Sequence, residues 1–176
     1  DYVPDGVPFV MASDLKGGEV DFANCSKIPE TLARTLRIGF ARSGDVLLSH
    51  KGTVGEVARL GDFATDFVML TPQVTYYRVT DKSRLDPDWL YFAFQTPGFR
   101  RLLEQYGKQS TRAYVGITTQ RELSIPIADG HEQSQTLSEL IKAEKAVLAA
   151  AQRVGALAEM RQRLVAEALR EVSNVY

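Results

Sequence analysis

The feature that most constrains how this chain can fold is the apolar stripe in its last third. Between residues 129 and 172 there is no proline, and apolar residues recur every three or four positions. That spacing predicts an amphipathic helix of about 43 residues, roughly 65 Å long at about 1.5 Å per residue. Helices in globular proteins average about 11–12 residues, so we expect this one to pack against another long helix.

The stripe supplies the candidate residues for contact with that partner helix. Asp129 followed by Glu132 has the spacing of a capping box at the helix start. Glu144 and Arg161 could fix the register of the helix pair. The candidate interface consists of Leu137, Leu140, Ile141, Val147, Leu148, Ala151, Val154, Ala158, Leu164, Val165, Ala168, Leu169 and Val172. We therefore expect a folded domain over residues 1–128 and a coiled-coil arm over residues 129–176.

Composition excludes several classes of protein for this 176-residue chain. It has 21 Lys plus Arg against 22 Asp plus Glu and no run of 18 apolar residues, so we expect no membrane segment. Its single cysteine, Cys25, permits neither an internal disulfide nor a cysteine-based metal site, and fits a reducing, cytoplasmic setting. We expect no metal and no cofactor.

Turn residues and apolar patterns divide the first domain into short segments. Gly-bounded or alternating apolar runs predict strands, and an apolar pattern after Pro87 predicts helix with an interruption at Pro97-Gly98. The predicted segments are a strand, a Gly-Gly turn and a return over 7–22, a short helix within 28–37, a hairpin over 44–61, a strand over 74–79, helices over 86–106, a polar loop over 107–118 and a strand over 121–127. Together they predict an α+β fold with a mixed, twisted sheet.

The hairpin is expected to be structural in its strands and functional at its tip. Its apolar positions Val46, Leu48, Val54 and Val57 should be buried, and Lys51 should point outward. A solvated turn lysine remains the plainer interpretation of Lys51.

Local charge points to an anionic partner although the net charge is −1. Residues 27–59 hold six bases against three acids, and residues 100–121 hold five bases against Glu104 alone. If these two segments meet in space they form one positive face, which is enough to hold phosphates.

The enzyme motifs that this sequence partly matches are incomplete. Residues 52–55 lack the glycine spacing of a dinucleotide loop, and no Ser or Thr follows Lys108 as a phosphate loop requires. Asp5, Asp14 and Lys16 loosely match a metal-dependent nuclease pattern, which we keep as a third hypothesis. We assign no catalytic residue and expect no enzyme activity.

Two polar segments have the side chains that contact DNA. Arg and Lys pair with guanine, Gln pairs with adenine, and Ser and Thr contact bases or phosphates. The candidates are Ser49, His50, Lys51 and Thr53 at the hairpin tip, and Lys108, Gln109, Ser110, Thr111, Arg112 and Tyr114 in the polar loop. Three plainer interpretations stay open: both segments are ordinary polar loops, Arg112 contacts only a phosphate, or Tyr114 begins a strand.

The order of these segments resembles one half of the specificity subunit of type I restriction–modification systems. The matching pieces are VPFVMASDLKGGEVDF (7–22), GDVLLSHKGTVGEVARL (44–60), DPDWLYFAFQTPGFRRLL (86–103) and GKQSTRAYVGITTQRELSIPIADGHEQ (107–133). Together with the long helix they cover nearly the whole chain.

The resemblance implies a mixed α/β target recognition domain whose loops lie on double-stranded DNA. It implies two such domains held apart by an antiparallel pair of long helices, which also dock the methyltransferase subunits, and it implies restriction subunits as further partners. Family members usually carry two recognition domains and this chain has one, so it is either a half-subunit that dimerises or part of a longer subunit. The alternative is a protein-interaction scaffold with an oligomerising coiled coil, which predicts no salt-dependent affinity for DNA.

Overall fold

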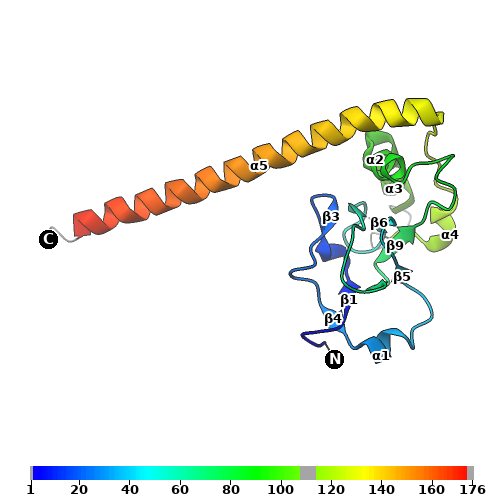
Figure 1. Cartoon of the computed structure of the whole chain (residues 1–176), viewed down its shortest axis with the longest axis horizontal. Coiled ribbons are helices and arrows are strands. Elements are labelled where there is room, and N and C mark those ends of the chain that lie inside the picture. Colours follow the sequence, from blue (N-terminus) through cyan, green and yellow to red (C-terminus); the bar gives the residue numbers. More distant parts are fainter. Residues whose placement is uncertain (1, 108–113, 174–176) are drawn as a thin grey trace. The chain divides into compact units, whose positions relative to one another are not determined.

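The computed structural model describes residues 2–107 and 114–173, without the side chains of Ala168 and residues 171–173. Its fold is α+β (Figure 1). In chain order the elements are β1 (Val7–Val10), the 3-10 turn η1 (Ala12–Asp14), β2 (Leu15–Lys16), β3 (Glu19–Val20), β4 (Lys27–Ile28), α1 (Glu30–Ala33), β5 (Phe40–Ala41), β6 (Val46–Ser49), β7 (Val57–Arg59), β8 (Val68–Leu70), β9 (Val74–Tyr77), α2 (Pro87–Gln95), α3 (Pro97–Gly107), α4 (Ile117–Gln120) and α5 (Gly130–Ser173). Contacts divide the chain into two compact units, residues 1–133 and 134–176.

The first unit contains two larger sheets and one small hairpin. The four-stranded sheet has the order β4-β1-β8-β5, in which β1 and β8 are parallel and the other pairs are antiparallel. The three-stranded sheet has the order β7-β6-β9 and is antiparallel throughout. Strands β2 and β3 pair around the Gly-Gly turn that the sequence predicted.

Successive side chains of each strand point to opposite faces of its sheet, so each sheet packs against a different neighbour on either side and the elements form layers. In β8, Met69 packs with the apolar side chains around α1, while Val68 faces a cluster between the two larger sheets. In β6, Leu47 joins the cluster between the sheets, while Val46 and Leu48 face α2 and α3. The order is therefore α1, four-stranded sheet, three-stranded sheet, then α2 and α3, and Figure 1 shows α1 and the α2–α3 pair at opposite ends of this unit.

The predicted hairpin is confirmed as β6 and β7, which pair in antiparallel register from Val46 opposite Arg59 to Leu48 opposite Val57. Val46, Leu48 and Val57 are buried as expected. Val54 is only half-buried, because it lies in the turn beyond the last ladder pair and covers the edge of the cluster around α3.

The predicted helical segment is confirmed, with its break in place. The Asp86 side chain accepts the Asp88 N–H at 2.7 Å and caps α2, and Pro87 occupies the first turn. Thr96 leaves the helical conformation before Pro97 restarts it as α3. The Asp129 carboxylate likewise accepts the Glu132 N–H at 2.9 Å, as the predicted cap at the start of α5 requires.

The expected strand over 121–127 is wrong, because these residues pair with no other strand in the described part of the chain. Leu123 and Ile125 are half-buried against the cluster around α2, so their alternation reflects side-chain packing rather than strand pairing. The Trp89 Nε1–H donates to the Pro126 carbonyl at 2.8 Å and fixes the segment there. The loop predicted over 107–118 also ends earlier than expected, since α4 begins at Ile117.

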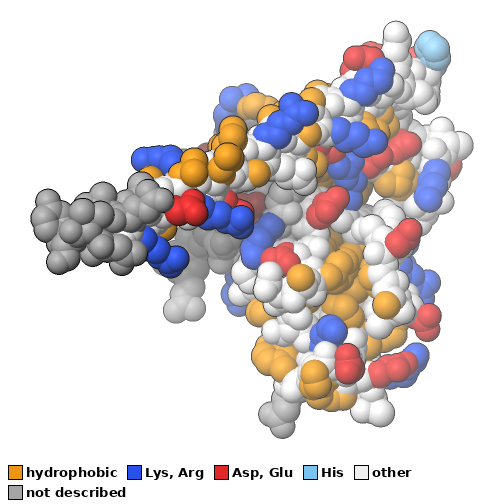
Figure 2. Space-filling view, turned by 60° about the vertical axis from the view of Figure 1, so that its left-hand side comes forward, with side chains coloured by type: hydrophobic (Ala, Val, Ile, Leu, Met, Phe, Trp, Pro, Cys, Tyr) orange, Lys and Arg blue, Asp and Glu red, His pale blue; other side chains and the backbone are white. Residues whose placement is uncertain are grey.

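Helix α5, taken by itself, is one continuous helix of 44 residues, as its periodicity predicted (Figure 1). Large apolar side chains along it are exposed, including Val147 at 68 % and Val154 at 67 %. In the view of Figure 2, apolar side chains gather along this helix with Lys and Arg between them. Among the described residues, no helix combines the length and the apolar character needed to cross a membrane.

Candidate nucleic-acid interface

The two segments predicted to contact DNA meet in the structure. Lys51, at the hairpin tip, forms an antiparallel bridge with Tyr114, at the end of the polar loop. Next to this bridge the Val115 N–H donates to the His50 carbonyl at 2.9 Å. Backbone pairing therefore fixes the tip and the loop end as one surface, which we call the tip–loop surface: Lys51, Thr53 and Tyr114 with their backbone.

A tight turn at the hairpin tip presents Lys51 and Thr53. The buried Ser49 hydroxyl accepts the Glu56 N–H at 2.9 Å, and the Gly55 N–H donates to the Ser49 carbonyl at 2.9 Å. Gly52 and Gly55 have φ values of 81° and 96°, where a side chain would be strained. These contacts close the turn, so both Lys51 and Thr53 are exposed at its end.

The other side of the tip–loop surface is anchored by Gln120. This buried side chain donates its amide to the Val115 carbonyl at 2.7 Å and accepts the Tyr77 hydroxyl at 2.9 Å. Val115 itself is buried in the cluster that includes Leu103. Burial raises the pKa of Tyr77 above its ordinary value of 10.0, which keeps its hydroxyl protonated as a donor. The residues after Tyr114 are thus held on β9.

His50 lies beneath this surface rather than on it. Its side chain is 4 % exposed, and its ring lies 5.7 Å from the Tyr114 ring at a tilt of 49°. Burial lowers its pKa below 6.5, a backbone hydrogen bond with Val115 opposes this, and the Lys51 charge adds to the lowering. The imidazole is therefore neutral at neutral pH.

The positive charge of the tip–loop surface comes from Lys51, and Arg37 adds to it. Neither side chain forms an ion pair with any residue in the described ranges, and both are exposed. Arg37 lines a cavity together with His50 and Tyr114, which places it beside this surface. Arg37 belongs to the basic segment 27–59, but nothing in the local sequence sets it apart from the other bases there.

The predicted DNA-contacting residues thus fall into three groups. Lys51, Thr53 and Tyr114 are exposed on one surface, with Tyr114 at 40 %. Ser49 and His50 are buried in its support. The remaining candidates lie outside the described residues: Lys108, Gln109, Ser110, Thr111 and Arg112.

The cavity beside the surface has a volume of about 650 Å³ and is here called the Thr71 cavity. Strands β8 and β9, the tip and the segment around Arg37 contribute to its wall. His50, Thr71 and Thr75 are among the residues of this wall, and each also has a buried polar atom (Nδ1, Oγ1 and Oγ1, respectively) without a hydrogen-bond partner among the described residues. Apolar side chains make up most of the rest.

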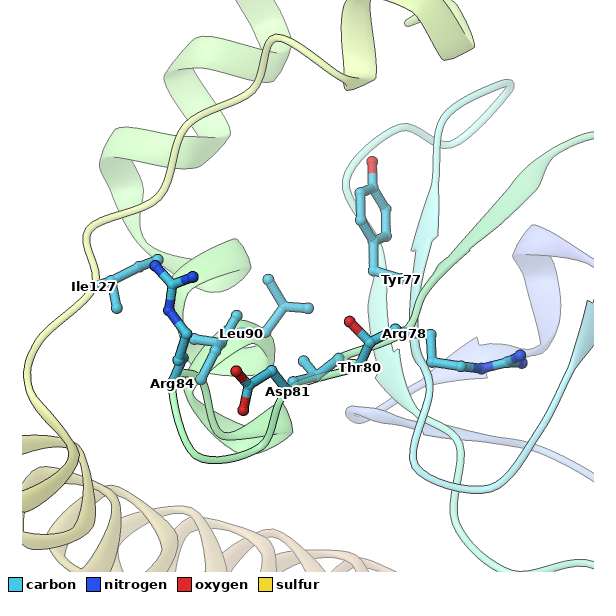
Figure 3. Close-up of a pocket in the computed structure, with 9 residues that line it drawn as sticks. Tyr77, Arg78, Thr80, Asp81, Arg84, Leu90 and Ile127 are labelled. Atoms are coloured by element: carbon cyan, nitrogen blue, oxygen red, sulfur yellow. The ribbon is translucent and has the colours of Figure 1, made fainter.

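A second cavity of about 410 Å³ lies at the other end of β9 (Figure 3). Its polar side chains already have partners in several cases. Tyr77 bonds to Gln120, and Arg78 points away from the other labelled side chains and pairs bidentately with buried Asp45 at 2.7 and 2.8 Å. These contacts serve the fold, because they satisfy a buried carboxylate and a buried hydroxyl.

Two of the three residues of the nuclease hypothesis, Asp14 and Lys16, form contacts within local turns. The Asp14 carboxylate is buried and accepts the Met11 N–H at 2.8 Å, and Lys16 forms an ion pair with Asp21 at 2.9 Å. Within residues 2–107 and 114–173, no three His, Cys, Asp or Glu side chains lie close enough together to hold a metal.

The candidate partner-helix residues all lie on α5. Its exposed apolar side chains include Leu140, Val147, Leu148, Val154, Leu164 and Val165. The side chains of Ala168 and Val172 lie outside the described residues. Leu157 and Met160, which the stripe did not include, are exposed as well.

Comparison with known proteins bears on the fold. No protein-family model and no curated protein sequence matches this chain. A solved structure from work on complex assembly and conformational transition of the type I R-M system is similar, with a TM-score of 0.59 and 18 % sequence identity. The match covers 85 % of this chain and 33 % of that chain. This chain therefore has the fold of about one third of a protein of a type I restriction–modification complex.

Proposed function

We propose that this chain is a sequence-specific double-stranded DNA recognition module of a type I restriction–modification specificity subunit. It would direct methyltransferase and restriction subunits to a target site and carry out no catalysis itself. The observation that supports this most is the Lys51–Tyr114 bridge, because it joins the two segments selected from sequence for their DNA-contacting side chains. The shared fold with a type I system protein supports the same assignment.

The tip–loop surface suits phosphate contact first and base contact second. Lys51 and Arg37 are exposed cations without ion-pair partners in the described ranges, so neither must break a salt bridge to bind a phosphate. Thr53 and Tyr114 add a hydroxyl and an aromatic ring at the same place. Ser49 and His50 are buried, so we assign them to the support of this surface.

The arm would bring a second recognition half to the same DNA. Exposed apolar side chains recur along α5, and such a face is stable in water only against another apolar face. We propose an antiparallel coiled coil formed by residues 129–176, either in a homodimer or with the other half of a longer subunit. Residues 1–128 would form the recognition domain.

Salt-dependent duplex binding tests this function. We expect the full chain to bind a random-sequence duplex with a dissociation constant on the order of 10⁻⁴ to 10⁻⁶ M at physiological salt. Lys51→Ala should weaken binding to all sequences about equally and lower the salt slope by about 1. Fluorescence anisotropy at several salt concentrations measures both quantities.

Lys82→Ala is the matched control. Lys82 is also an exposed lysine, but it follows the Tyr77 end of β9, opposite the end at which Val74 pairs with Ser49 and the tip begins. Its substitution should leave the slope unchanged. Duplex affinity that does not vary with salt would contradict the proposal and favour the protein-interaction scaffold.

If binding does depend on salt, selection from a random-site library in the presence of the cognate methyltransferase gives the target sequence.

A further inference from the structure

The loop between α1 and β5, residues 34–39, presents a large apolar side chain to solvent. Ile38 is 82 % exposed, and no other large apolar side chain in the described ranges is as exposed. The end of the loop is tied to β8, where the Gly39 carbonyl accepts the Leu70 N–H at 2.8 Å. Since Ile38 buries so little of its surface, it adds little to the stability of the domain. Its apolar character is therefore better explained by a contact with another molecule.

Ile38 belongs to a larger group of exposed apolar side chains, here called the Ile38 patch. A single exposed apolar side chain is ordinary, whereas a group of them around one site marks an interaction surface. Both the α1–β5 loop and Tyr114 of the tip–loop surface line the Thr71 cavity, so the patch extends from one to the other around its rim. Its members line this cavity and are each at least 36 % exposed: Leu36, Ile38, Tyr76, Tyr114 and Ile117.

The charges at the Ile38 patch favour DNA as the partner. Arg37 on the α1–β5 loop and Lys51, bridged to Tyr114, are both exposed and form no ion pair within the described ranges. Among the described residues that line the cavity there is no Asp or Glu. Apolar groups between cations match a duplex, which has phosphates on its outside and apolar groups at some base edges. Because Tyr114 belongs to the patch and to the tip–loop surface, a duplex held on that surface lies beside the patch.

An aliphatic side chain restricts what can be read on that duplex. Isoleucine neither donates nor accepts hydrogen bonds, and stacking hides the faces of the bases. Among the groups at the major-groove edges of the base pairs, the apolar one is the C5-methyl group of thymine. We propose that Ile38 is a specificity-determining residue that contacts a thymine methyl group, while Arg37 beside it contacts a phosphate. This inference rests on the proposed function and adds a base contact that needs no hydrogen bond.

The test pairs the side chain with the methyl group, on the duplex selected from the random-site library. Each thymine is replaced in turn by deoxyuridine, which lacks only the C5-methyl group. With the full wild-type chain, at least one replacement should raise the dissociation constant about fourfold, the factor expected for one buried methyl group. Ile38→Ala should raise the dissociation constant for the unmodified site about tenfold, because it removes several such groups from the contact. In that variant, deoxyuridine at the same position should have no further effect.

Ile127→Ala is the matched control, because Ile127 is also exposed, at 61 %, but lines the second cavity. It should change neither the affinity nor the effect of deoxyuridine, and both variants should keep the melting temperature of the wild type.

Fluorescence anisotropy at several salt concentrations separates this inference from the proposed function. If wild-type binding does not vary with salt, the proposed function and the methyl contact fail together. If binding varies with salt but no thymine position depends on Ile38, or the selected site has no thymine, only the methyl contact is overturned. Unchanged DNA affinity of Ile38→Ala, together with loss of the methyltransferase subunit in light scattering, also overturns it and assigns the Ile38 patch to a protein partner.

Discussion

The Gln120 anchor leads to a quantitative prediction about the support of the tip–loop surface. Tyr77→Phe deletes the hydroxyl that donates to the Gln120 amide oxygen at 2.9 Å, and leaves that buried oxygen without this hydrogen bond. We expect a loss of about 1–2 kcal/mol in the free energy of unfolding. Gln120→Leu deletes that bond and the 2.7 Å bond to Val115, and leaves two protein groups without a partner. We expect it to cost about 2–4 kcal/mol.

The coupling between the two substitutions is the decisive quantity. In the background of Gln120→Leu the Tyr77 hydroxyl has no partner, so Tyr77→Phe should be neutral or stabilising there. The double-mutant cycle should therefore give a coupling energy of about 1–2 kcal/mol. Urea denaturation followed by Trp89 fluorescence measures it, because the single tryptophan belongs to the first unit and bonds to Pro126 in its native environment. Strictly additive losses would show that the Tyr77–Gln120 bond contributes nothing, and the anchor would then have to be reassigned.

Three further predictions concern other parts of the chain. Since burial lowers the pKa of His50 below 6.5, the unfolded state takes up a proton first as the pH falls, so stability should drop below about pH 6.5. Chemical denaturation at pH 5.5 and 7.5 should show a smaller drop for His50→Gln than for the wild type, and equal drops would contradict the argument. Burial raises the pKa of the Cys25 thiol to about 12, so at pH 8 Ellman's reagent should modify it only as fast as the protein unfolds; rapid modification of the native protein would exclude that burial. Leu148→Asp puts a charge into the exposed stripe of α5 and should lower the oligomer mass or release the methyltransferase subunit in light scattering, while Trp89 fluorescence reports an unchanged first unit. An unchanged mass together with intact complexes would count against the coiled coil.

Local sequence signals predicted the elements that local contacts determine. The hairpin over β6 and β7 follows from Gly-bounded apolar runs, and the break between α2 and α3 follows from Pro97. By contrast β8 and β5 were missed, because β8 is buried on both faces and pairs with β1 from far away in the sequence. The strand predicted over 121–127 is wrong because its alternating apolar side chains pack against the cluster around α2 without any strand pairing among the described residues.

The candidate site was predictable only in part for a related reason. The hairpin tip and the polar loop could each be selected from residue types, but charge patterning left open whether the two segments meet. The burial of Ser49 and His50 could not be foreseen, because Glu56, Gln73 and Val115 must come together around them. The Thr71 cavity is lined by five separate segments of the chain, and no single stretch of sequence carries a signal for it.

The burial of the β6–β7 hairpin on both faces has a consequence for how this molecule could evolve. The strands carry the stability of the hairpin, because their side chains fill the clusters on either side. The exposed Lys51 and Thr53 fill neither cluster, and the turn depends on glycine conformations and backbone bonds rather than on these two side chains. Substitutions at these two positions should therefore be tolerated at little cost in stability. Selection could then change what the tip recognises while the rest of the domain stays the same, and a library randomised at positions 51 and 53 offers a direct route to new specificities.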